Sequence, residues 1–229
     1  MGFTCGLVGL PNAGKSTLFG ALTRTKAQSG NYAFTTIEPN RGIVPVPDKR
    51  LDTITHYVQT KKIVPTTMEF VDIAGLIKGA SKGEGLGNKF LGHIREVDAI
   101  AHVVRCFEDS NVPHVSDIID PAADIDTINT ELMIADMDSL DKRKTKIEKL
   151  AKSGDKEARS QMEVLKKLID GINNGQPSRT LTGLSDEDQN FVKSLTLLSA
   201  KPVLYICNVM DPGDTDNELV QKVKAIAAE

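Results

Sequence analysis

The chain has 229 residues, of which 40% are hydrophobic and 26% are charged. A chain of this length and composition can bury a sizeable core, which excludes disorder for the bulk of it. The formal net charge of -3 argues against a surface that coats nucleic acid nonspecifically, and no DNA partner is expected.

The first predicted strand, residues 3–10, leads into the run Gly9–Ser16, GLPNAGKS, and a helix is predicted to follow at residues 16–25. The run fits G-x-x-x-x-G-K-[ST], the loop that cradles nucleotide phosphates. Its glycines allow a close backbone approach, and the helix N-terminus adds a dipole that favours anions. A glycine-rich turn without a ligand is the alternative reading.

The residues of this loop have separate chemical roles. Lys15 reaches the β- and γ-phosphates, and the Ser16 hydroxyl is a ligand for Mg²⁺. We therefore predict a nucleoside triphosphate bound together with magnesium. The predicted nucleotide-binding residues of this part of the chain are Asn12, Ala13, Gly14, Lys15, Ser16 and Thr17.

A threonine hydroxyl that completes the magnesium shell in the triphosphate state is expected in the segment 31–40, about twenty residues after the loop. The segment contains Thr35 and Thr36, and we favour Thr36 as the metal ligand.

Two further strands are predicted at residues 42–47 and 67–72, and the second ends in Asp72-Ile73-Ala74-Gly75. In a D-x-x-G arrangement the carboxylate of Asp72 holds Mg²⁺ through water, while the N–H of Gly75 meets the γ-phosphate. Loss of that phosphate releases the glycine, so the glycine-rich segment 76–87 can act as a switch. A plain surface loop is the alternative.

A predicted strand at 99–106 precedes a stretch of different character. Between about 120 and 174, apolar residues recur in steps of three and four, which predicts two helices joined by a tight turn at 153–155. Such a pair forms an antiparallel coiled-coil hairpin. A third helix is predicted to begin after Ser185 and to end near Leu198. The basic run 142–146 fits either a solvated helix face or a surface that docks to RNA phosphate.

The last predicted strand, 203–207, ends at the segment Asn208-Val209-Met210-Asp211. Guanine-specific switches carry N-K-x-D there, and the lysine stem packs on the base. Here Val209 removes that packing, and Pro212 constrains how Asp211 is aimed. We predict that Asn208, Val209 and Asp211 contact the base. The aspartate itself favours guanine, and the direction of its carboxylate decides the preference; the family resemblance described below favours ATP, with GTP possible.

Strands that alternate with helices predict an α/β fold with an open, mostly parallel sheet covered on both faces. The predicted division is a P-loop NTPase domain over 1–118, a helical coiled-coil insertion over 119–198, and the continuation of the NTPase domain over 199–229.

Four segments together with the loop Gly9–Ser16 carry a family resemblance: residues 31–40, 72–91, 95–99 and 120–132. The chain resembles the YchF subfamily of the Obg-related translation-factor NTPases, the Obg-like ATPases, across essentially its whole length. The resemblance implies a Ras-like nucleotide domain with a coiled-coil insertion, a cytoplasmic location, ribosome binding and tolerance for ATP. It also implies that final strands and a C-terminal TGS domain follow residue 229.

The predicted catalytic residues are Lys15, Asn12 and Gly75. Leu76 stands where many switch GTPases keep a water-positioning glutamine, so slow hydrolysis is expected. In related NTPases an asparagine that matches Asn12 coordinates K⁺, which makes K⁺ a candidate cofactor beside Mg²⁺. A turn residue with a locally bonded amide is the alternative for Asn12.

Other features exclude further classes of function. No segment approaches eighteen apolar residues and no export signal is present at the N-terminus, so no membrane partner is expected. Cys5, Cys106 and Cys207 are dispersed, as is typical of reduced thiols in a cytoplasmic protein. The leading hypothesis is a slow, magnesium-dependent triphosphatase that switches on the ribosome. The alternatives are a GTP-specific GTPase and a nucleotide-gated ribosome-binding module with negligible turnover.

Overall fold

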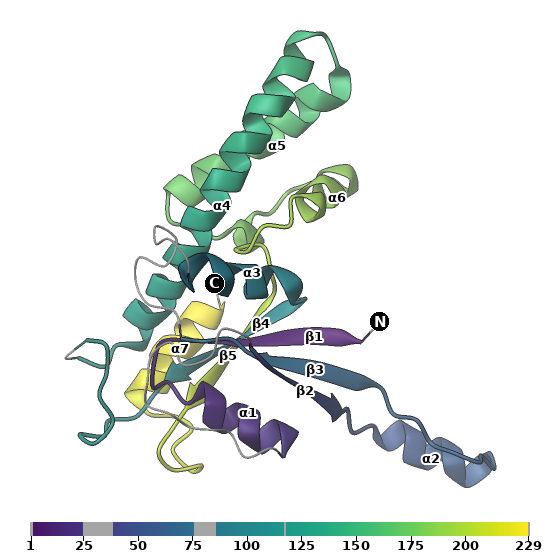
Figure 1. Ribbon diagram of the computed structural model, residues 1–229, viewed down its shortest axis with the longest axis vertical. Coiled ribbons are helices and arrows are strands. Elements are labelled where there is room, and N and C mark those ends of the chain that lie inside the picture. Colours follow the sequence, from purple (N-terminus) through teal and green to yellow (C-terminus); the bar gives the residue numbers. More distant parts are fainter. Residues whose placement is uncertain (1, 25–38, 76–85, 117, 229) are drawn as a thin grey trace.

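The structure is a computed structural model that describes residues 2–24, 39–75, 86–116 and 118–228 (Figure 1). Its centre is a five-stranded sheet in the order β2-β3-β1-β4-β5. The strands are β1 (Phe3–Val8), β2 (Asn40–Pro45), β3 (Thr67–Asp72), β4 (Ala99–Arg105) and β5 (Val203–Asn208). Strand β2 runs antiparallel to β3, and the other pairs are parallel. The predicted α/β fold with a mostly parallel sheet is confirmed.

The parallel strands end at one edge of the sheet. Leu7 pairs with Asp72, Val8 with His102, and Arg105 with Asn208. The segments that follow β1, β3, β4 and β5 therefore emerge close together. In open α/β sheets this carboxyl edge is where ligands bind.

Helices cover both faces of the sheet, as predicted (Figure 1). Helix α1 (Lys15–Thr23) packs through Phe19 on one face, against Cys5, Leu7 and Ala101. The other face carries α3 (Leu86–Glu96), α7 (Glu218–Ala228) and the first half of α4 (Pro121–Lys152). The buried apolar residues that join that face to these helices are Val8, Val71, Ile94, Ile100, Val104, Ile125, Ile128, Leu132, Val220 and Val223.

The second half of α4 and helix α5 (Lys156–Asn173) form the predicted antiparallel hairpin, which extends away from the sheet (Figure 1). Each helix begins at an aspartate cap: Asp120 accepts a hydrogen bond from the backbone of Ala122, and Asp155 accepts one from Ala158. The buried residues of the hairpin core include Leu140, Ile147, Met162, Leu165 and Leu168. One continuous helix thus packs on the sheet with its first half and builds the hairpin with its second.

A carboxylate in the middle of α4 holds the chain where it returns from the hairpin. Asp136 is 1% exposed, and it accepts hydrogen bonds from the backbone N–H groups of Leu198 and Ser199, each at 2.7 Å. The Ser199 hydroxyl donates to the same side chain at 2.6 Å. The return segment also contains a short 3-10 helix, η1 (Ser178–Thr180), and α6 (Asp186–Ser194).

The structure corrects several predicted bounds and adds three α-helices that were not predicted: α3, α7 and a helix over Lys49–Tyr57. Helix α6 ends at Ser194 rather than near Leu198, and Thr196 has a left-handed φ of 51° that α-helical continuation would not allow. Strand β1 ends at Val8 because the turn into the phosphate loop starts at Gly9. Helix α2 (Lys49–Tyr57) was not predicted; none of its residues is buried, and it lies beyond the outer end of β2 and β3 (Figure 1).

The predicted domain limits at 118 and 198 stay predictions. The packing of Ile125, Ile128 and Leu132 joins the start of the predicted insertion to the core on the sheet. The described helices contain no apolar stretch of the length that a membrane span requires.

Candidate nucleotide site

The predicted phosphate loop links β1 to α1 at the carboxyl edge of the sheet. Gly14 directly precedes α1 with a left-handed φ of 99°, and a Cβ at this position would lie 2.4 Å from Nδ2 of Asn208. Only glycine satisfies both constraints. Asn12 also has a positive φ, of 62°, which asparagine tolerates better than most residues. The loop is thus a tight turn whose backbone is fixed by its sequence.

Lys15 is buried at the centre of this loop. It is 6% exposed, and its Nζ donates a hydrogen bond of 2.8 Å to the carbonyl oxygen of Leu10. Burial lowers the pKa of Lys15 to about 8, and the negative charge of Asp72 acts in the opposite direction. The ammonium group is therefore mostly charged at neutral pH, and the phosphates of a nucleotide would stabilise that charge further.

Ser16 and Asp72 come together from α1 and the end of β3. The Ser16 side chain lies close enough to the Asp72 carboxylate to favour its charged form. Burial raises the pKa of Asp72, while Ser16 and the charge of Lys15 oppose this rise. A hydroxyl and a carboxylate in contact, next to the lysine that reaches the phosphates, are a donor set suited to Mg²⁺ shared with a nucleotide.

Gly75 lies against the same loop. A Cβ placed on Gly75 would come within 3.1 Å of the backbone nitrogen of Pro11 and within 3.3 Å of Nζ of Lys15. Gly75, whose N–H is predicted to meet the γ-phosphate, thus lies beside Lys15, which is predicted to reach the β- and γ-phosphates. Thr36, the predicted third metal ligand, and Leu76 lie outside the described residues.

The segment after β5 reaches the loop from the other side. Nδ2 of Asn208 donates a hydrogen bond of 3.0 Å to the carbonyl oxygen of Ala13. Val209 is half-buried and packs in the apolar cluster beneath α7. Asp211 is exposed, and its Oδ1 accepts a hydrogen bond of 2.8 Å from the backbone of Gly213. One carboxylate oxygen of Asp211 is therefore engaged in its own turn.

Asn12 makes a contact that the sequence did not predict. Its Nδ2 donates a hydrogen bond of 3.0 Å to the carbonyl oxygen of Pro113, which belongs to the loop between β4 and α4. The side-chain amide of Asn12 is therefore bonded to a distant residue and not within its own turn, which was the alternative considered for it.

Thr17, in the first turn of α1, is exposed. The β4–α4 loop was not predicted as part of the site; the one signal available was a charged residue, Arg105, within the otherwise apolar run at the end of β4.

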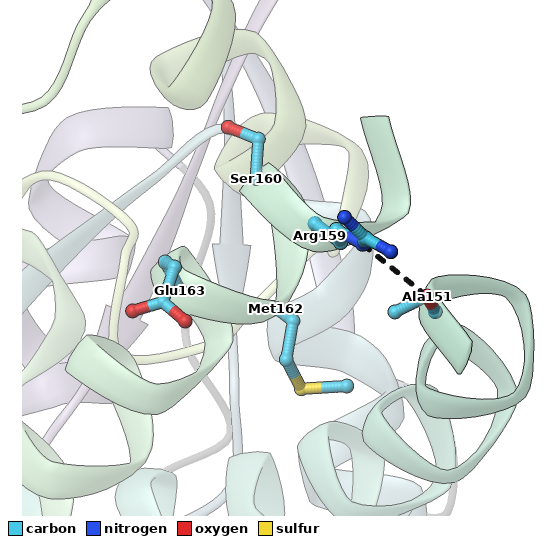
Figure 2. A pocket seen from close by; sticks show the side chains of 5 residues that line it. All are labelled: Ala151, Arg159, Ser160, Met162 and Glu163. Atoms are coloured by element: carbon cyan, nitrogen blue, oxygen red, sulfur yellow. Dashed lines mark hydrogen bonds between the residues drawn. The ribbon is translucent and has the colours of Figure 1, made fainter. Parts of the chain in front are cut away.

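A hollow lies beside the turn that joins α4 to α5, and Figure 2 shows the side chains that line it. There Arg159 reaches the carbonyl oxygen of Ala151 at 3.5 Å, and Ser160, Met162 and Glu163 line the rest. The hollow is open to solvent, and the guanidinium of Arg159 is hydrogen-bonded to the carbonyl oxygen of Ala151. It lacks the convergence of charged groups that marks the phosphate loop.

Comparisons with known proteins show the family to which this chain belongs. The family model described as 50S ribosome-binding GTPase matches residues 4–167. The ribosome-binding ATPase YchF of Haemophilus influenzae is 54% identical over 228 residues, which are 100% of this chain and 62% of that protein. The same protein of Bacillus subtilis is 54% identical over 231 residues, with 100% of this chain and 63% of that protein covered.

A solved structure shows the same architecture. The YchF GTPase of Schizosaccharomyces pombe is 36% identical, with a TM-score of 0.76, and the match covers 97% of this chain and 61% of that one. This chain thus spans less than two thirds of the length of the relatives it matches. The chain belongs to the family of 50S ribosome-binding GTPases, and its resemblance to the YchF subfamily is confirmed across its length.

Proposed function

We propose that this chain is the nucleotide-binding part of a magnesium-dependent triphosphatase that acts as a slow switch on the ribosome. The observation that carries the proposal is the convergence of Lys15, Ser16, Asp72 and Gly75 at one edge of the sheet. These groups provide a cation for the phosphates, two oxygen ligands for a metal, and a backbone N–H that can follow the γ-phosphate. The names of the YchF relatives support the same activity.

In this proposal Ser16 and, through water, Asp72 would hold Mg²⁺, and Thr36 would complete its ligand set. Bound Mg²⁺ would supply charge neutralisation between the phosphates. The chain's own contribution is positional: the loop amides and Lys15 hold the triphosphate, and Gly75 senses its last phosphate. Leu76 cannot orient a water molecule, so we expect slow turnover.

K⁺ is proposed as a second cofactor beside the phosphates, with Asn12 as its ligand. The bond to Pro113 uses the amide nitrogen of Asn12, so its carbonyl oxygen Oδ1 is not consumed by that contact. An amide oxygen is a suitable ligand for an alkali cation. K⁺ would then compensate part of the charge that develops during phosphoryl transfer.

The ribosome is the proposed partner, and the helical insertion, residues 119–198, is the proposed docking element. The relatives carry ribosome binding in their names. The basic run Lys142–Lys146 lies on α4, with most of its side chains exposed to solvent. Exposed lysine and arginine on a rigid helix suit contact with RNA phosphate. Such a role implies a cytoplasmic location.

The preference for ATP over GTP is a separate prediction. Guanine recognition needs the Asp211 carboxylate aimed at the base, but its Oδ1 already accepts the hydrogen bond from Gly213. Val209 packs beneath α7 and provides no long stem to cover the base. We therefore expect ATP to bind at least as tightly as GTP. Competition binding at matched Mg²⁺ measures this, and GTP binding more than tenfold tighter would instead establish a GTP-specific GTPase.

A further inference from the structure

The loop that follows β4 is built around one buried arginine. Arg105 is 1% exposed, and its guanidinium group donates hydrogen bonds to three backbone carbonyl oxygens of the loop. Nε donates to Phe107 at 3.1 Å, Nη1 to Val112 at 2.9 Å, and Nη2 to Asp109 at 3.1 Å. The Cζ atom lies 4.7 Å from the centre of the Phe107 ring. One side chain thus ties together three carbonyl groups of residues 107–112, in addition to the hydrogen bonds that Asp109 accepts from the backbones of Asn111 and Val112.

The planar fork of Arg105 is what this arrangement needs. Guanidinium presents donors in fixed directions, so it can bridge carbonyl groups that point at it from three sides. The carbonyl dipoles in turn compensate a buried positive charge. A lysine would keep the charge but not the geometry of the fork, and a methionine would keep only the volume.

The same loop contacts the nucleotide site at two points. Pro113, next to the carbonyl that Nη1 holds, accepts the hydrogen bond from Asn12 in the phosphate loop. At the start of the loop, the backbone N–H of Cys106 donates to the carbonyl oxygen of Asn208 at 2.7 Å. The path of the loop therefore determines where the Pro113 carbonyl meets Asn12.

We propose that Arg105 is a positioning residue of the nucleotide site, which acts through the carbonyl of Pro113 on Asn12. Without the guanidinium fork, the loop loses three of the bonds that hold it, while His114 Nε2 still lies 3.1 Å from Oδ2 of Asp124 on the far side of Pro113. The Pro113 carbonyl is then held from one side only, and its position relative to Asn12 is less well defined. Asn12 sits at a left-handed φ in the phosphate loop, so the loss of its partner frees the turn that must close around the phosphates. The proposal rests on the nucleotide-binding function proposed above.

A double-mutant cycle in nucleotide affinity tests this role. The variants are Arg105→Met, Asn12→Ala and the double variant, titrated with a non-hydrolysable ATP analogue and Mg²⁺. We expect Arg105→Met to weaken binding by about fivefold, and by less than twofold when Asn12→Ala is already present. Losses that simply multiply would contradict the proposal, because they would mean that the two residues act independently.

Two further variants separate positioning from charge and from general destabilisation. Arg105→Lys retains the charge and should weaken binding as Arg105→Met does, and the cycle can be repeated with it where the methionine variant does not fold. Full affinity in the lysine variant would overturn the proposal. Absence of ATP binding by the unmodified chain would contradict the proposed function itself.

The matched control is Arg179→Met. Arg179 is half-buried and donates to Asn129 at 2.9 Å and to Tyr205 at 3.4 Å, at the base of the helical insertion. Its loss should lower the melting temperature without changing nucleotide affinity. Equal loss of affinity in the Arg105 and Arg179 variants would show that destabilisation alone explains the effect, and would overturn the proposal.

Discussion

Replacing Lys15 with alanine is expected to weaken triphosphate binding by well over tenfold, a loss of more than about 1.4 kcal/mol. The Nζ atom already faces the inside of the phosphate loop, where it donates to the carbonyl of Leu10. When a nucleotide binds, the Lys15 ammonium group would exchange the Leu10 carbonyl for phosphate oxygens. Alanine has no charged group that could make this contact. Titration with ATP and Mg²⁺ measures the loss.

The control for this variant is Lys49→Ala. Lys49 is exposed at the start of α2, away from the carboxyl edge of the sheet. This variant should bind ATP as the unmodified chain does. Unchanged affinity in Lys15→Ala, with the fold retained, would refute the assignment of the phosphate loop.

The second large effect concerns stability. Asp136→Ala removes the acceptor of three buried hydrogen bonds, from the backbones of Leu198 and Ser199 and from the Ser199 hydroxyl. Each buried donor left without a partner costs about 1–3 kcal/mol. We therefore expect the free energy of unfolding to fall by roughly 3 kcal/mol or more, measured by urea denaturation.

Asp138→Ala is the matched control, because Asp138 is exposed on the same helix two residues later. It should change the free energy of unfolding by less than about 0.5 kcal/mol. Equal effects in the two variants would show that the hydrogen bonds of Asp136 do not hold the return segment.

The sequence predicted the parts of the fold that depend on local pattern. Each parallel strand is a short apolar run, and Gly14 and Lys15 belong to a motif whose chemistry requires its spacing. The hairpin was visible because Ile147, Leu165 and their neighbours repeat at helical spacing. Helices α2, α3 and α7 were not predicted; each is short, with 9, 11 and 11 residues, and α2 has no buried residue.

Contacts between distant residues could not be predicted in this way. The bond from Asn12 to Pro113 spans 101 residues, and the bonds of Asp136 span more than sixty. Contacts at such sequence separations produce no periodic pattern in the sequence, so neither the Asn12 bond nor the Asp136 bonds could be predicted from it. The direction of Asp211 depends on a local turn with Gly213, and the single sequence left that direction open.

Single-turnover hydrolysis of ATP tests the central claim most directly. The chain is mixed with limiting ATP and Mg²⁺, in KCl or in NaCl at equal ionic strength, with and without ribosomes. We predict slow release of phosphate by the chain alone, faster release in KCl than in NaCl, and a further increase with ribosomes. ATP that binds but is not hydrolysed under any of these conditions would contradict the account and identify the chain as a nucleotide-gated binding module.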